Sequence, residues 1–285
     1  MSESNITIRE IEAFEELEAV PDVEKEVWGL SETDVMPLTL IIATKEAGSL
    51  WLGAFDGPTL IGFAFGLHGV EGGRLMIHSH MLAVLPAYRE TNIGYRLKLQ
   101  QRERALAMGI QVMTWTFDPL QSKNAHLNFA KLGVISNRYK PDFYGPETSS
   151  VLHRNSTDRL WVQWHMSSRR VQDRLGGKRQ APRSIPMPET TPALVRMGDA
   201  GQPDLTKSTL APDAGRMTIE IPPDINLLQE RDQQLAAQWR AATRWAFTEA
   251  LKQGFVVSDF IRPITHSGPA GQYVLTKPSI DEICV

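Results

Sequence analysis

The sequence has little cysteine and no strong excess of charge. Cys284, next to the C-terminal residue, is the single cysteine in 285 residues, so an intrachain disulfide is excluded. Basic and acidic residues nearly balance, and the net charge of −3 gives no electrostatic reason to expect nucleic acid as a partner. A chain without disulfides is typical of a reducing compartment, and we therefore expect a cytoplasmic protein.

Long hydrophobic runs are absent as well. No apolar stretch is long enough to cross a bilayer, and the first residues include acids where a secretory signal would have a basic and then an apolar segment. We therefore expect no membrane partner. The hydrophobic fraction of 42% over 285 residues is still enough to bury a full core, in one large domain or in two.

The most informative segment of the chain runs from Met81 to Met108. An apolar strand pattern ends at Val84, Pro86 marks a turn, and a short polar loop then opens into a helix that runs to about Met108. Such a loop presents backbone N–H groups without partners at the positive end of a helix dipole. This is an arrangement that suits a phosphate group.

The pattern Arg89-x-x-Asn92-x-Gly94 resembles the pyrophosphate-binding loop of the GNAT superfamily of acyl-CoA-dependent N-acyltransferases, which is usually Arg/Gln-x-x-Gly-x-Gly/Ala. Asn92 stands where the family usually has its first glycine. Asparagine tolerates a positive φ better than most side chains, so the exchange is compatible with the loop. Its Cβ and amide crowd the phosphate, and we expect weaker or shifted cofactor contacts.

The strand that leads into the loop carries two histidines. Because side chains alternate along a strand, the sequence predicts one shared face for four residues: His78, His80, Leu82 and Val84. Imidazole exchanges protons near neutral pH. The His-x-His strand resembles that of serotonin N-acetyltransferase, where two histidines help to remove the proton of the attacking amine. The alternatives are half-buried structural histidines or a metal pair. No metal is predicted, because the strand offers no cysteine or acid to complete a zinc site.

A further helix pattern follows at a spacing typical of the same family. Ser122 to Gly133 resembles the family's Asn-x-x-Ala-x-x-x-Tyr-x-x-x-Gly helix. Ser122 replaces the usual pantetheine-contacting Asn, for which Asn124 is a substitute. Phe129 replaces a Tyr that often protonates the leaving thiolate. The general acid is therefore left open, and proximity in sequence suggests three candidates: His126, Tyr139 and Tyr144.

The predicted elements follow the order β-α-α-β-β-β-α-β-α-β-β over about residues 5–167, as the resemblance requires. This is an α/β (α+β) fold, with a mixed, mostly antiparallel sheet flanked by helices. Helices are expected from Phe14 to Trp28 and from Pro37 to Ala47. We predict a GNAT-like acyltransferase domain at residues 1–168, a Pro/Gly-rich connector at 169–215, and a smaller C-terminal α/β extension at 216–285. The extension has the order strand-helix-strand-strand, and its helix runs from Leu227 to Gln253.

The resemblance implies an enzyme that transfers an acyl group from acetyl-CoA, or from another acyl-CoA, to an amine of a small molecule. The amine attacks directly in a ternary complex, and His78 and His80 take its proton. The residues expected to bind the cofactor lie on the strand, in the loop and on the further helix: Leu82, Ala83, Val84, Arg89, Glu90, Thr91, Asn92, Ile93, Gly94, Tyr95, Asn124 and Phe129.

Two other classes of protein stay open on the sequence. Phe129 and Asn92 are the only support for a non-catalytic acyl-CoA-binding or sensor module that acts through a protein partner, which would bind without transfer. A structural or interaction protein that has lost the cofactor is disfavoured by Arg89, Gly94 and the histidine pair. The sequence does not choose between acetyl, succinyl and longer acyl groups, and it leaves the acceptor amine and a homodimer open.

Overall fold

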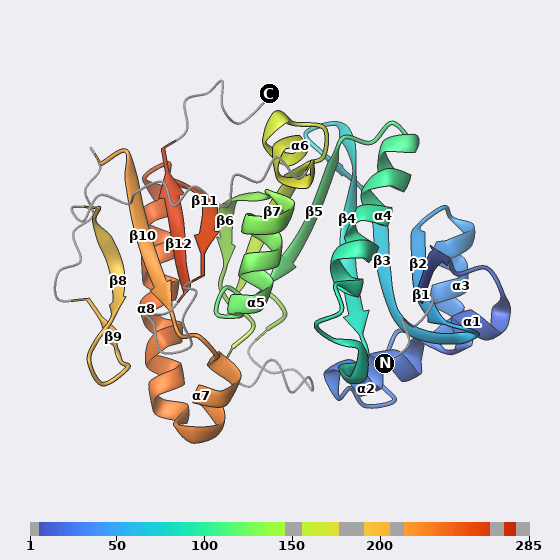
Figure 1. The fold of residues 1–285 in the computed structure, drawn as a ribbon, viewed down its shortest axis with the longest axis horizontal. Coiled ribbons are helices and arrows are strands. Elements are labelled where there is room, and N and C mark those ends of the chain that lie inside the picture. The colour runs from blue at the N-terminus through green and yellow to red at the C-terminus, as the bar shows by residue number, and fades with distance from the viewer. Residues whose placement is uncertain (1–5, 146–155, 177–190, 206–213, 263–270, 278–285) are drawn as a thin grey trace. The chain divides into compact units, whose positions relative to one another are not determined.

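The computed structural model describes residues 6–145, 156–176, 191–205, 214–262 and 271–277 (Figure 1). These residues form two compact units. The first contains the described residues up to Trp115, and the second contains those from Thr116 onward. The division thus falls inside a strand, whereas the sequence places the first boundary after residue 168. The predicted grouping into domains 1–168, 169–215 and 216–285 stays a prediction.

The first unit is a mostly antiparallel sheet with helices on both faces. Its strands follow the order β1-β2-β3-β4-β5, and only β4 and β5 are parallel. The fold class predicted from the sequence is confirmed. The elements are β1 (Ile6–Glu10), α1 (Phe14–Glu18), α2 (Val20–Trp28), α3 (Leu38–Glu46), β2 (Leu50–Asp56), β3 (Thr59–Glu71), β4 (Arg74–Val84), α4 (Ile93–Ala107) and β5 (Val112–Phe117).

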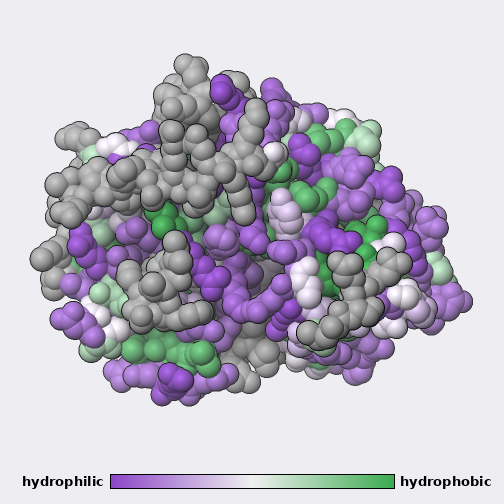
Figure 2. Space-filling view, in the orientation of Figure 1, coloured by the Kyte–Doolittle hydropathy of each residue, from purple (hydrophilic) through white to green (hydrophobic). Residues whose placement is uncertain are grey.

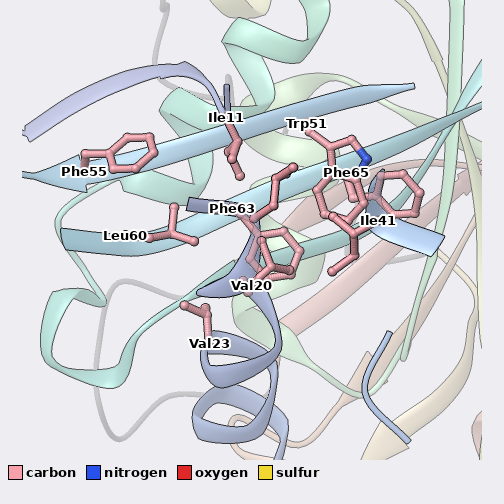
Figure 3. Packing of buried hydrophobic residues seen from close by; sticks show 11 residues of the cluster. Ile11, Val20, Val23, Ile41, Trp51, Phe55, Leu60, Phe63 and Phe65 are labelled. Atoms are coloured by element: carbon pink, nitrogen blue, oxygen red, sulfur yellow. The ribbon is translucent and has the colours of Figure 1, made fainter. Parts of the chain in front are cut away.

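Helices α1, α2 and α3 cover one face of this sheet. Aromatic side chains of β2 and β3 form the middle of the core on this face, where the rings of Trp51 and Phe65 stack with their centroids 4.0 Å apart. Figure 3 shows these rings beside Val20 of α2 and Ile41 of α3. Each large side chain buried here contributes about 1.5–3 kcal/mol to stability.

Helix α4 packs on the opposite face. Its residues Ile93 and Leu97 are fully buried against Leu52 and Ala64 of the sheet. Residues four apart lie on one side of a helix, which explains why these two face the sheet together. The packing fixes the start of α4, and therefore the end of the loop before it, relative to β4.

The first predicted helix is interrupted at Ala19. The sequence predicts one helix from Phe14 to Trp28, but the structure has α1 and α2 with a break between them. Pro21 is the physical reason, because it has no N–H to donate to Leu17 and favours the first turn of a new helix. The order of the elements is otherwise as predicted.

The second unit has strands in the order β7-β6-β11-β12-β10-β8-β9, with β8 and β10 parallel and the other neighbours antiparallel. A π-helical segment, His126–Leu132, continues α5 and ends at Gly133. The elements are α5 (Ser122–Ala125), β6 (Ile135–Lys140), β7 (Arg159–His165), α6 (Arg169–Leu175), β8 (Ala193–Met197), β9 (Pro203–Asp204), β10 (Arg216–Ile221), α7 (Ile225–Arg231), α8 (Gln233–Lys252), β11 (Val256–Ile261) and β12 (Gly271–Thr276).

Two sequence predictions differ from the structure in this unit. The helix expected from Leu227 to Gln253 is divided at Asp232, whose carboxylate accepts a hydrogen bond from the Leu235 N–H and caps α8. The segment predicted as an irregular connector contains α6 and the buried strand β8, which pairs with β10. Strand β8 is too short to show a period, and its pairing with a distant strand is a tertiary effect.

Hydrophilic residues cover much of the described surface on the face shown in Figure 2, with hydrophobic residues among them in smaller groups. Large exposed hydrophobic side chains include Val70 and Leu75 at the end of the β3–β4 hairpin. Within the described ranges, no helix is both long and apolar enough to cross a membrane.

Candidate active site

The strand that carries the histidines, β4, contains a β-bulge. Phe65 of β3 pairs with Met81, but the next residue, Gly66, pairs with Ser79, so His80 is the extra residue on β4. A bulge interrupts the alternation of side chains along a strand. It therefore changes which residues of β4 share a face.

The prediction that His78 and His80 share a face with Leu82 and Val84 is therefore wrong. Leu82 and Val84 pack on the α4 side of the sheet. His80 lies edge-on to Phe65, which belongs to the core under α1–α3, with the ring centroids 6.3 Å apart. The two imidazole rings do lie together, with centroids 6.2 Å apart. The structure thus brings the histidine pair together but turns it to the face opposite α4.

Both histidines are held in the neutral form. Burial is the main cause that lowers the pKa of His78 to about 4, and Coulombic repulsion from the protonated forms of His80 and Lys98 lowers it further. Its Nδ1 lies 2.9 Å from the Thr114 hydroxyl oxygen. His80 is more exposed, yet loss of surrounding water lowers its pKa as well. A neutral imidazole can accept a proton, which is the form that base catalysis needs.

The loop between β4 and α4 contains two non-glycine residues at positive φ. Glu90 has a φ of 70° and Asn92 a φ of 61°. Asn92 immediately precedes α4 in the left-handed region, so the prediction that asparagine is compatible with this position is confirmed. The Tyr88 hydroxyl donates to the Asp56 carboxylate at 2.8 Å and ties the start of the loop to β2.

The first turn of α4 presents backbone amides that have no acceptor within the helix. The first helical hydrogen bond runs from the Arg96 N–H to the Asn92 carbonyl at 3.0 Å, and the Asn92 side chain does not cap the helix. The turn also holds no acidic residue. The amides of Ile93 and Gly94 therefore lie at a positive helix end suited to an anion.

Gly94 is a glycine that the fold itself does not require. A Cβ added there would lie 3.8 Å from Leu82 and 4.0 Å from Val84, which are ordinary contacts. Gly62 of β3 differs, because a Cβ there would lie 2.6 Å from the Ala83 carbonyl oxygen. Since packing explains Gly62 but not Gly94, the missing side chain at Gly94 is consistent with a ligand that approaches the backbone closely.

Residues Leu82, Ala83 and Val84 pair with β3 along one edge of β4. On the other edge, the pairing with β5 that the structure describes is confined to Ile77 and His78. At the end of the strand, the Arg89 guanidinium donates to the Val84 carbonyl at 3.4 Å. The last residues of β4 thus lie beyond its described pairing with β5, at an edge where β-strand addition by an extended ligand is geometrically reasonable.

Two predicted cofactor residues belong to the second unit. Asn124 is exposed on α5. Phe129 is fully buried, and its ring packs against Phe117 and Tyr273 with centroids 6.2 and 5.8 Å apart. Of the general-acid candidates, Tyr139 donates its hydroxyl proton to Asp158 at 2.5 Å, and burial raises the pKa of this tyrosine. A proton held in this way is poorly placed for release.

Sequence reasoning missed a buried polar cluster between α4 and β4. It consists of Ser79, Lys98 and Gln101, all of them nearly inaccessible to water. A signal was present, because Gln101 falls four residues after Leu97 and eight after Ile93, on the stripe that faces the core. A polar residue on such a stripe indicates a buried hydrogen-bonded network.

The described part of the chain contains no group of three or more His, Cys, Asp or Glu side chains placed to hold a metal ion. The candidate site consists of a neutral histidine pair, an adjoining strand edge, and a loop with a helix N-terminus. Together these parts can accept a proton and hold an anion.

No family model matches the chain. No curated protein sequence matches it either. Similar solved structures include the ribosomal-protein-S18-alanine N-acetyltransferase from Escherichia coli, at 15% identity and a TM-score of 0.45 over 57% of this chain and 95% of that one. A putative acetyltransferase from Salmonella typhimurium, solved with its cofactor acetyl-CoA, has 17% identity and a TM-score of 0.46 over 58% and 96%.

An aminoglycoside 6'-acetyltransferase type Ii is also similar, at 17% identity and a TM-score of 0.46 over 57% of this chain and 99% of that one. Structural similarity at 15–17% sequence identity does not establish that two proteins share an activity. The function has to be inferred from the residues of this chain.

Proposed function

We propose that this protein is an acyl-CoA-dependent N-acyltransferase that moves an acetyl or another acyl group to an amine of a small molecule. One observation carries the proposal: a histidine pair on β4 is followed directly by a loop and a helix N-terminus with no acidic residue in its first turn. The first part deprotonates an amine, and the second binds the pyrophosphate of CoA.

The cofactor would be held mainly by backbone groups. Amides between Glu90 and Tyr95 surround the pyrophosphate, and the Arg89 guanidinium adds a positive charge beside it. The pantetheine arm pairs with the edge of Leu82 to Val84, and a main-chain N–H of β4 stabilises the oxyanion of the tetrahedral intermediate. Asn124 and Phe129 stay predicted contacts from the second unit.

The chemical step is direct attack of the amine on the thioester carbonyl. A C–N bond forms, the C–S bond breaks, and CoA thiolate leaves. The amine proton passes to His80 or His78, directly or through water. Proximity of two bound reactants supplies much of the rate. The small-molecule nature of the acceptor, the acyl chain, a homodimer and a cytoplasmic location stay predictions.

Calorimetric titration with CoA, acetyl-CoA and succinyl-CoA tests the first part of this proposal. We expect binding in the micromolar range, and a preference among the three identifies the acyl group for an amine screen. Absence of binding to all three would contradict the assignment of the loop. Binding without transfer to any amine would favour the acyl-CoA sensor.

The double variant His78→Ala/His80→Ala tests the second part. Loss of a general base typically costs about 10²–10⁴-fold in rate. We expect turnover to fall in that range and to depend more steeply on pH, while CoA affinity measured by calorimetry stays nearly unchanged. Normal turnover with weakened CoA binding would remove the histidines from the chemistry.

A further inference from the structure

Lys98 is a buried cation without a carboxylate partner among the described residues. It is 2% exposed, and its Nζ donates to the Ser79 hydroxyl at 2.7 Å. The same Nζ lies 3.8 Å from the centroid of the Trp115 ring, a cation–π contact. Burial lowers the pKa of Lys98 well below its ordinary value. Such a group is costly for stability, so the core alone does not explain its presence.

Ser79 links Lys98 to a second residue of α4. Its hydroxyl accepts from Lys98 and donates to the Gln101 side-chain carbonyl at 2.8 Å. The Gln101 amide nitrogen is buried and has no hydrogen-bond partner within the described structure. Two helix residues three positions apart thus hold a single strand hydroxyl, and one of them leaves a donor unsatisfied to do so.

The position of Ser79 gives this contact a consequence for the site. Ser79 is the last regularly paired residue of β4 before the bulge at His80. The side chain of Ser79 points to α4, while the rings of His78 and His80, its two neighbours, meet on the opposite face. Holding Ser79 against α4 therefore fixes the part of the strand from which both imidazoles project.

We propose that Lys98, with Gln101, is a positioning residue that holds Ser79 against α4 and so fixes the bulge that sets the two histidines side by side. Its catalytic meaning rests on the proposed acyl transfer, but the positioning itself is a property of the free protein. Because α4 also begins at the anion-binding loop, the same helix sets both the histidine pair and the cofactor end of the site.

The pKa of His78 depends on groups of its own strand and of α4. Its cross-strand neighbours are Leu67 of β3 and Thr114 of β5, neither of which is ionisable. The charges that act on it are those of His80 on its own strand and Lys98 on α4, both in the direction that lowers its pKa. Loss of Lys98 removes one of these charges, so the pKa of His78 rises from about 4 toward its ordinary 6.5.

Histidine NMR titration of the full-length protein without acyl-CoA tests this proposal. The variants are Lys98→Met, which keeps the apolar stem, and Ser79→Ala, which keeps the lysine but removes the link. Arg104→Met is the matched control, because it removes a cation from the same helix outside the cluster. We expect both cluster variants to shift the ring signals of His78 and His80, and Lys98→Met also to raise the pKa of His78.

Turnover of Lys98→Met should fall about 10- to 100-fold, as expected for a small misplacement of a catalytic group, with the KM for acyl-CoA little changed. The acid limb of its pH profile should move to higher pH. Histidine signals like those of Arg104→Met in both cluster variants would overturn the proposal. Absence of acyl transfer by the unaltered protein would contradict the proposed function alone, because the NMR readout needs no acyl-CoA.

Discussion

Lys98 of the first unit and Arg240 of the second are both cations at buried helix positions, and their surroundings differ in one respect. Arg240 is 5% exposed and forms two parallel hydrogen bonds to Asp118, each 2.8 Å long, and this carboxylate raises its pKa. Among the described residues, Lys98 has a hydroxyl and an indole face as its partners and no carboxylate, and burial lowers its pKa. The free-energy cost of burying a cation is offset at Arg240 by the charge of Asp118, whereas no described carboxylate offsets it at Lys98.

The difference separates a structural cation from a candidate functional one. A bidentate pair of arginine and carboxylate satisfies both partners, and it explains Arg240 through the fold alone. Lys98 has no such explanation, and it is joined through Ser79 to the strand of the histidine pair. A buried charge without a counter-charge therefore points to the site, whereas a paired one points to the core.

The largest effect is expected from breaking the ion pair between Arg240 and Asp118. Asp118→Ala leaves Arg240 buried without its partner, and removing one member of a buried ion pair costs about 3–5 kcal/mol. Chemical denaturation should show a free energy of unfolding lowered by this amount. The double variant Asp118→Leu/Arg240→Met, which removes both charges, should recover most of the loss. A loss below about 1 kcal/mol in the single variant would mean that the pair is not structural.

The next effect concerns the unpaired cation and is a pH dependence. The pKa of Lys98 is lower in the folded state than its ordinary 10.5. Between these two values the unfolded chain binds the extra proton, so stability rises with pH through this window, by up to about 1.4 kcal/mol per pH unit. Lys98→Met should lose this contribution to the slope.

Denaturation series at several pH values from neutral to about pH 10 measure this slope. Lys98→Met should also be at least as stable as the unaltered protein at neutral pH, because it removes an uncompensated buried charge. Arg104→Met should keep the slope. Equal slopes in the unaltered protein and in Lys98→Met would show that the pKa of Lys98 is not lowered in the folded state, and the contrast with Arg240 would then be wrong.

A smaller effect concerns Asn92, which is the N-cap residue of α4, and Gly94 in its first turn. Gly94→Ala adds a methyl group that the fold accommodates, so stability should change by no more than about 1 kcal/mol, while CoA affinity should fall about tenfold. Asn92→Gly should keep or improve CoA binding, because glycine adopts the positive φ at position 92 freely and removes a crowding side chain. Calorimetric titration of the two variants with CoA measures both predicted changes in affinity. Unchanged affinity in Gly94→Ala would place the ligand elsewhere.

Much of the first unit could be predicted from local pattern. The β2–β3 hairpin, the strand–loop–helix segment and the left-handed Asn92 follow from apolar alternation and turn residues, which act within a few positions along the chain. The break of the first helix at Ala19 was also within reach of the sequence, since Pro21 is a local signal. The pairing of the short strand β8 with β10 was not, because its partner lies more than twenty residues away.

The sequence by itself determined that two histidines lie on a strand that leads through a short polar loop into a helix, because residue type and spacing specify these elements. Only the tertiary structure decided which face the histidines occupy. A single extra residue in the pairing of β4 with β3 reverses the alternation at His80, and strand register is set by contacts between strands. The same packing placed Lys98 against Ser79, with no carboxylate partner in the described part of the chain, since burial and charge pairing depend on residues that only folding brings together.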